Sequence, residues 1–156
     1  MAEDVQIKTI PALQVLGIEG NGGRNELFHD LGYIFEYLYD NNSSAFIVGP
    51  GIGVFFSEFE PGKYLAAVPV REKVFPAVAN IRLIRLPEME CACARHHGNS
   101  ELIGKTLEDL RHYLVKNSLP AGLPRREIYL GLETGETAGP LTEIQIPLKL
   151  EKAYAG

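Results

Sequence analysis

This sequence lacks the features that mark several broad classes of protein. It has no run of Lys or Arg longer than the pair Arg125 and Arg126, and its formal net charge at pH 7 is -5. Nucleic-acid-binding surfaces carry a basic stripe, so we expect no direct binding to DNA or RNA. No apolar run approaches the roughly 18 residues that a membrane-spanning helix requires, and residues 1–4 have neither the positive charge nor the apolar stretch of a secretion signal. We therefore predict a cytoplasmic protein without a membrane partner.

Cysteine is also scarce, because Cys91 and Cys93 are the only two in the chain. They lie two apart in a predicted strand, a poor geometry for a disulfide. His96 and His97 follow closely, but the spacing Cys-x-Cys-x-x-His-His lacks the turn that wraps ligands around zinc. We predict two unpaired cysteines packed in a core, as suits a reducing cytosol, and no metal site.

The sequence also contains no catalytic triad, no phosphate-binding loop and no cofactor fingerprint. The glycine-rich segment 20–23 has neither the GxGxxG nor the GxxxxGK spacing, so we expect a flexible loop there and no cofactor. What is present is the balance of an ordinary globular protein, with 46% hydrophobic and 22% charged residues in 156. We predict one domain spanning residues 1–156.

The two halves of the chain resemble one another. Four segments of the first half recur in the second half, in the same order and at nearly constant spacing. The matching pairs are Ile7-Lys8-Thr9-Ile10 with Ile81-Arg82-Leu83-Ile84, Gly20-Asn21 with Gly98-Asn99, Tyr37-Leu38 with Tyr113-Leu114, and Val68-Pro69-Val70 with Ile146-Pro147-Leu148. This pattern indicates an internal duplication, with one repeat at about residues 5–72 and the other at about residues 78–149.

Each predicted repeat reads as a strand, a helix and two further strands. Long strands are expected at 5–19 and 80–97, each bent at a proline, Pro11 or Pro87. Shorter strands are expected in the first half at 51–57 and 64–70, and in the second half at 127–132 and 141–148.

Between these strands, two apolar stripes at helical spacing predict amphipathic helices. The stripes are Leu27, Leu31, Ile34, Phe35 and Leu38 in the first half, and Ile103, Leu107, Leu110 and Leu114 in the second. Asn25 and Ser100 are the predicted N-caps, and Asn41 and Asn117 suit the helix ends. We predict an α+β fold with an antiparallel sheet and two long helices on one sheet face, arranged about a pseudo-twofold axis with a central ligand cleft.

Strand alternation then sorts the candidate site residues. Ile128, Leu130 and Leu132 are expected to face the helices, as are Ile52, Val54 and Phe56. Glu127, Tyr129, Gly131, Gly53 and Phe55 are then expected to line a pocket on the opposite face. A carboxylate beside aromatic rings attracts a desolvated organic cation.

On this reading Glu127 has no partner until ligand arrives. It can alternatively be a solvated strand-edge residue paired with Arg125 or Arg126, or a general base acting on water. Glu143 shares the pocket face or sits at an open edge.

Three further tyrosines are candidate ligand-binding residues. Tyr33 and Tyr37 lie one helical turn apart beside the first apolar stripe, and Tyr64 opens a strand that can close a pocket wall. Packing at the boundary of the core is the alternative for Tyr33 and Tyr37. His96 and His97 point to opposite faces of their strand, so at most one of them reaches a pocket.

A set of motifs along the chain resembles a known family. In chain order they are Ile7-x-x-Ile10-Pro11, Gly49-Pro50-Gly51-Ile52, Val68-Pro69-Val70, Arg126-Glu127-Ile128-Tyr129-Leu130 and Thr142-Glu143-Ile144-Gln145-Ile146-Pro147-Leu148. They resemble the gyrase-inhibitor-like family, which includes the effector-binding domains of AraC- and MerR-type regulators. The resemblance implies a pocket for flat, apolar, often cationic molecules, with the glutamate of the Glu-x-Tyr strand at its base. No helix-turn-helix module is recognisable, so the chain resembles a stand-alone version.

Three hypotheses for function follow from these observations and the resemblance. The first is a binding module that senses or sequesters small amphipathic or cationic molecules. The second is a hydrolase of electrophilic, cyclopropane-type natural products, with Glu127 as its catalytic group. The third is a protein-interaction module of the kind that inhibits gyrase.

Overall fold

The computed structural model describes residues 5–71, 76, 78–99, 102–130 and 141–149. Its strands are β1 (Gln6–Ile10), β2 (Leu13–Gly22), β3 (Ile52–Phe55), β4 (Gly62–Pro69), β5 (Arg82–Leu86), β6 (Met89–His97), β7 (Arg125–Tyr129) and β8 (Leu141–Pro147). Its helices are α1 (Arg24–Asp40), α2 (Ile103–Lys116) and the short 3-10 helix η1 (Ser44–Phe46). Neither long helix in this described part of the chain is long and apolar enough to cross a membrane.

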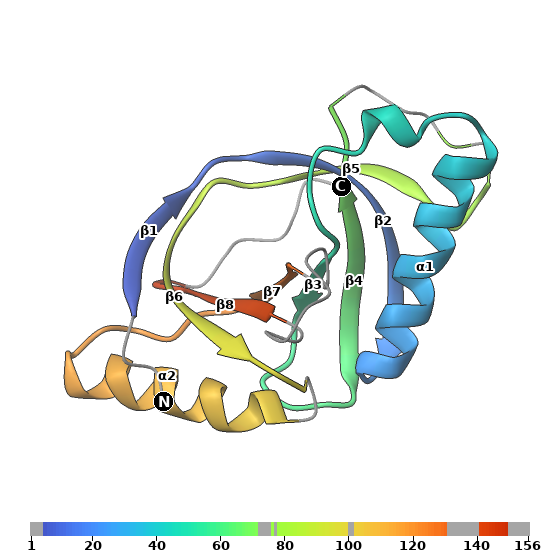
Figure 1. Ribbon diagram of the computed structural model, residues 1–156. Helices are drawn as coiled ribbons and strands as arrows, with labels where there is room; N and C mark the ends of the chain where they lie inside the picture. The colour runs from blue at the N-terminus through green and yellow to red at the C-terminus, as the bar shows by residue number, and fades with distance from the viewer. Residues whose placement is uncertain (1–4, 72–75, 77, 100–101, 131–140, 150–156) are drawn as a thin grey trace.

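All eight strands belong to one antiparallel sheet in the order β1-β6-β8-β7-β3-β4-β2-β5. The sheet is strongly curled, and both long helices lie on its outer side (Figure 1). The predicted α+β class, with its antiparallel sheet and two long helices, is confirmed. The internal duplication and its pseudo-twofold axis stay predictions.

The two long strands expected from the sequence are each divided in two at a proline. Pro11 separates β1 from β2, and Pro87 separates β5 from β6, because proline has no backbone N–H for the ladder. The division lets each segment join a different neighbour. β1 pairs with β6 of the second half, whereas β5 pairs with β2 of the first half.

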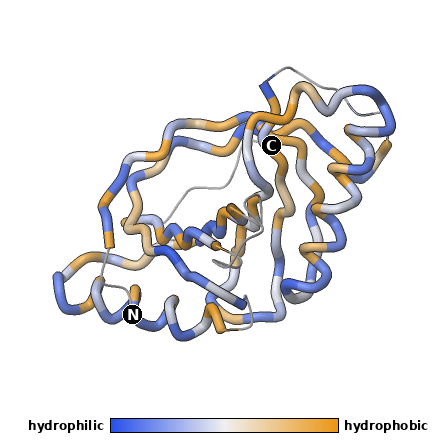
Figure 2. Tube along the Cα trace, in the orientation of Figure 1, coloured by the Kyte–Doolittle hydropathy of each residue, from blue (hydrophilic) through white to orange (hydrophobic). Residues whose placement is uncertain are grey.

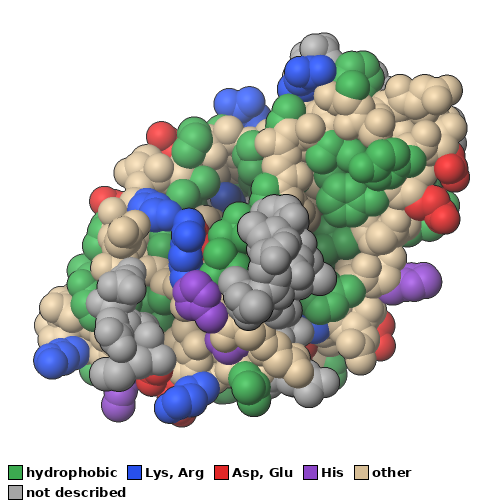
Figure 3. All heavy atoms as spheres, viewed as in Figure 1, with side chains coloured by type: hydrophobic (Ala, Val, Ile, Leu, Met, Phe, Trp, Pro, Cys, Tyr) green, Lys and Arg blue, Asp and Glu red, His purple; other side chains and the backbone are tan. Residues whose placement is uncertain are grey.

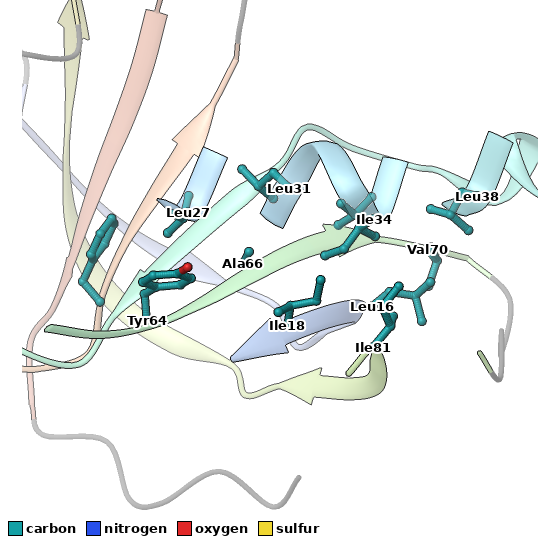
Figure 4. Packing of buried hydrophobic residues seen from close by; sticks show 12 residues of the cluster. Leu16, Ile18, Leu27, Leu31, Ile34, Leu38, Tyr64, Ala66, Val70 and Ile81 are labelled. Atoms are coloured by element: carbon teal, nitrogen blue, oxygen red, sulfur yellow. The ribbon is translucent and has the colours of Figure 1, made fainter. Parts of the chain in front are cut away.

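The helices pack on the sheet through the predicted apolar stripes. The buried residues Leu27, Leu31, Ile34 and Leu38 of α1 lie against β2 and β4 (Figure 4). Helix α2 packs in the same way on β6 and β8, where Ile144 and Ile146 meet its buried leucines. Figure 2 shows hydrophobic and hydrophilic residues alternating along both helices, as one buried face requires.

The helix ends only partly follow the prediction. Asn41 and Asn117 do end α1 and α2, and the side-chain amide of each donates a 2.8 Å hydrogen bond to the carbonyl of a tyrosine four residues earlier. Asn25, however, lies inside α1. The N-cap is Gly23, whose N–H donates to Glu26 Oε1 at 2.8 Å. Ser100 lies outside the described residues.

The sheet face on which the helices pack is opposite to the one predicted. Ile52, Val54 and Ile128 point away from the helices and pack with Val15, Leu65, Ile84 and Leu86 in a separate cluster, which Phe56 also joins. Glu127 and Tyr129 lie instead on the helix side. Strand alternation correctly separated Ile52, Val54 and Ile128 from Glu127 and Tyr129, but the sheet is apolar on both faces, so hydrophobicity alone did not identify the helix face. Gly131 and Leu132 lie outside the described residues.

Candidate functional site

The site is a cavity of about 410 Å³ beside the middle of α1. It is bounded by α1, by the loop that leads into β3 and by the end of β7. Its lining residues are Phe28, Leu31, Phe35, Gly49, Pro50, Gly51, Tyr129 and Leu130. The lining is mostly hydrocarbon, so the cavity suits an apolar aromatic guest. Figure 3 shows hydrophobic side chains gathering beside α1 on the face that it presents.

Tyr129 connects this cavity to the interior of the protein. Its ring lines the cavity and meets the ring of Phe28 edge-on, with centroids 4.9 Å apart. Its hydroxyl donates a 2.8 Å hydrogen bond to Glu127 Oε1. Burial, followed by the negative charge of Glu127 and this hydrogen bond, raises the pKa of Tyr129 well above 10.0. Tyr129 therefore stays a protonated donor across the physiological range.

Glu127 is fully buried, with no exposed surface, and its carboxylate is completely paired. Arg24 donates to it twice, from Nε to Oε1 at 2.9 Å and from Nη2 to Oε2 at 2.5 Å. Arg125 Nη2 adds a third contact, to Oε2 at 3.2 Å. The prediction that this carboxylate is unpaired is therefore wrong. A buried charge requires compensation, and two arginines provide it here.

Arg24 was not singled out from the sequence. It is the first residue of α1, and its side chain is 17% exposed. At its outer side Nη1 donates to Glu60 Oε2 at 2.5 Å, and its backbone N–H donates to Glu60 Oε1 at 3.1 Å. Burial by itself lowers the pKa of Arg24, but the hydrogen bond and charge of Glu127, together with the charge of Glu60, raise it above its usual value. The guanidinium thus joins a buried acid to a partly exposed one.

Phe55 supports the two arginines and does not line the cavity. The guanidinium carbon of Arg24 lies 5.6 Å from the centroid of its ring, and that of Arg125 lies 4.5 Å away. Both distances suit a cation–π contact. The ring is 3% exposed and packs in the core cluster under α1.

The other predicted tyrosines lie elsewhere. Tyr64 is buried and donates to Asp30 Oδ2 at 2.6 Å, which ties β4 to α1. Tyr33 is 40% exposed, and Tyr37 packs half-buried against the α1 core cluster. Of the aromatic residues predicted to bind ligand, only Tyr129 appears in the cavity lining.

The remaining polar candidates have structural partners. Glu143 lies on the opposite sheet face from Glu127, 3.3 Å from Lys8 Nζ and 3.5 Å from Arg95 Nε. Buried His96 contacts the Thr106 hydroxyl through Nδ1 and the Asn99 carbonyl through Nε2, both at 2.8 Å. Both cysteines are buried and free. The described residues contain no group of three or more His, Cys, Asp and Glu placed to hold a metal ion.

Several lining residues were also missed from the sequence. Phe28 was not considered, and Phe35 was assigned only to the core stripe, although with Leu31 they occupy one side of α1 at helical spacing. That second stripe beside the core stripe was the available signal. Residues 49–51 carried the family resemblance but offered no sign of a cavity. A Cβ at Gly51 would lie 3.2 Å from the Leu31 methyls, so Leu31 would have to shift slightly to admit a side chain there.

The structure combines a curled antiparallel sheet and two outer helices with an apolar pocket beside a buried acid. The family model for the GyrI-like small molecule binding domain matches residues 3–149. This chain belongs to that family.

Solved structures with the same fold are distant in sequence. The EcmrR C-terminal domain superposes with a TM-score of 0.78 at 18% identity, over 98% of this chain and 100% of that chain. A hydrolase from Listeria innocua gives 0.63 at 14% identity, over 92% and 90%. SAV2435 bound to tetraphenylphosphonium gives 0.58 at 19% identity, over 94% of each. No curated protein matches the sequence of this chain.

Proposed function

We propose that this domain binds flat, apolar aromatic molecules in the cavity beside α1 and acts as a sensor or a sequestering protein. The observation that carries the proposal is the 410 Å³ cavity, whose side-chain lining is aromatic and aliphatic apart from the Tyr129 hydroxyl. Burying apolar surface contributes about 25 cal/mol per Å², so an aromatic guest gains most of its affinity from these walls.

Ligands that carry a positive charge next to the ring system are included in this proposal. Tyr129 leads from the cavity wall to the Glu127 carboxylate, and a cation that reaches this acid gains both Coulomb and cation–π attraction. SAV2435, which shares the fold, was solved with tetraphenylphosphonium, an aromatic cation.

We place the protein in the cytoplasm, where unpaired Cys91 and Cys93 stay reduced. The net charge of -5 supports a small-molecule partner over direct contact with nucleic acid.

Hydrolysis with Glu127 as general base is the weaker candidate, although a Listeria innocua hydrolase shares the fold. A general base needs a free lone pair within reach of the water that it activates. Glu127 instead accepts hydrogen bonds on both oxygens from Arg24, Arg125 and Tyr129. We therefore favour binding without turnover.

The test uses phenanthridine and N-methylphenanthridinium as planar probes, with affinities measured by isothermal titration calorimetry. Phe28→Ala removes a lining ring that is 37% exposed and contacts Tyr129. We expect both probes to bind about tenfold more weakly to it, since losing one aromatic contact costs about 1.4 kcal/mol. Tyr39→Ala is the control, because Tyr39 is 63% exposed on the same helix and outside the cavity lining. Equal losses in both variants, or no binding of either probe to the wild type, would refute the proposal.

A further inference from the structure

The position next to Glu127 that an organic cation would take is already occupied by Arg24. Its guanidinium is a planar cation that pairs with both carboxylate oxygens and lies over the Phe55 ring. These are the contacts that a bound aromatic cation would make with an acid and a ring.

The charges around this position balance as they stand. Arg24 and Arg125 contribute two positive charges, and Glu127 and Glu60 contribute two negative ones. A cationic ligand that reaches Glu127 therefore meets no net attraction, because two guanidinium groups already contact this acid. A neutral aromatic ligand meets only the apolar walls and the Tyr129 hydroxyl.

Arg24 has a second acceptor, toward the protein surface. Glu60 is 31% exposed and holds Nη1 of Arg24 at 2.5 Å. Arg125 has no comparable route to the surface, because its side chain is only 4% exposed. Of the two arginines that contact Glu127, Arg24 is therefore the one whose side chain can turn toward the surface without moving its charge through the core.

We propose that Arg24 sets the charge preference of the pocket. While Arg24 holds Glu127, the cavity accepts neutral aromatic molecules, and a cation reaches the carboxylate only when Arg24 turns outward to Glu60. The inference rests on the proposed function, since it concerns ligands of the same cavity. A purely structural role for Arg24 would change stability but leave the ratio of the affinities for cationic and neutral ligands unchanged.

The decisive variant is Arg24→Met, which keeps an apolar stem and removes the charge. With phenanthridine and N-methylphenanthridinium at mildly alkaline pH, where the former is uncharged, we expect the affinity ratio to shift toward the cation by about tenfold or more. The affinity for phenanthridine should stay within about threefold of the wild-type value, because the walls are untouched. Arg82→Met is the matched control, since Arg82 pairs with Glu19 at 2.7 Å on the surface and should leave the ratio unchanged.

Glu60→Gln supplies an independent measurement if Arg24→Met does not fold. It keeps Arg24 and weakens only its outer acceptor, so Arg24 is confined to Glu127. We expect the cation to bind about threefold more weakly, with neutral binding unchanged. If wild type binds phenanthridine but neither variant moves the ratio, Arg24 is only a structural counter-ion and this inference fails alone. If wild type binds neither probe, the proposed function fails first.

Discussion

At the scale of single residues, the pocket depends on a glycine, Gly53, which has no side chain. Gly53 of β3 faces Glu127 of β7 across the sheet. A Cβ at this position would lie 2.6 Å from the Tyr129 hydroxyl, 2.9 Å from Leu27 Cδ1 and 3.0 Å from the Phe55 ring. Tyr129 reaches the buried carboxylate because nothing projects from residue 53.

Gly53→Ala should therefore destabilise the protein by about 1–3 kcal/mol, the usual cost of overpacking, and should weaken binding of both phenanthridine probes because Tyr129 must move. Urea denaturation and calorimetry measure the two effects. Gly104→Ala is the control, since a Cβ there meets nothing within 4 Å. It should leave binding unchanged and stabilise α2 by up to about 1 kcal/mol. A fully stable Gly53→Ala protein would contradict this account.

Glu127 and Tyr129 show how much of the site could be predicted from the sequence. Glu127 and Tyr129 were correctly grouped by alternation, and the structure joins them by a hydrogen bond. A pair with Arg125 was the alternative prediction for Glu127, and the structure contains it. The pair with Arg24 was not predicted, because Arg24 lies far away in the chain, at the start of α1. No local pattern marks a long-range pair of this kind.

At the scale of elements, helix α1 is held on the sheet by apolar packing and by hydrogen bonds to β7 and β4. Tyr64 of β4 donates to Asp30 of α1 at 2.6 Å. The two helices and the apolar side of each were predictable, because helical spacing of leucines is a strong local signal. The sheet face that they cover was not, since β3, β4 and β7 bury apolar residues on both faces.

Tyr64→Phe should lower the free energy of unfolding by about 1.5 kcal/mol at neutral pH, the lower end of the usual contribution of a hydrogen bond to a charged group. Burial first, then the hydrogen bond and charge of Asp30, raises the pKa of Tyr64 above 10.0. The unfolded chain therefore loses this proton at lower pH than the folded protein. Stability from Tyr64 is complete below pH 10.0 and declines as pH rises further.

Chemical denaturation across this alkaline range measures the effect. The wild type should lose stability above pH 10.0 more steeply than Tyr64→Phe, so that the difference between them narrows. If the two proteins lost stability in parallel as the pH rises, Tyr64 would have the same pKa in the folded and the unfolded state.

At the scale of the whole molecule, the two halves of the chain share one sheet by exchanging outer strands. β1 of the first half pairs with β6, β5 of the second half pairs with β2, and β3 and β7 join the halves at the centre. The strands and their antiparallel pairing were predictable, but this exchange was not. Pro11 and Pro87 indicated bends in long strands and did not indicate which neighbour each segment would take.

The exchange predicts that neither half folds alone as a monomer. Fragments covering residues 1–71 and 78–156 should each lack a cooperative thermal transition by circular dichroism, because each leaves long sheet edges and apolar surface without a partner. Mixing the fragments should restore a single transition. A cooperative transition from either monomeric fragment would show that the halves are independent folding units.

Because Arg24 contacts both a buried acid and a partly exposed one, a change beside the buried acid should be detectable at the protein surface. The Arg24 guanidinium contacts the fully buried Glu127 on one side and Glu60 on the other. Glu60 follows Phe59 in the sequence, and Phe59 is 73% exposed. The chain contains no tryptophan, so Phe59→Trp would place the sole indole emitter of the molecule beside Glu60. Its emission would then report rearrangement around Arg24 in real time, with no label on the ligand.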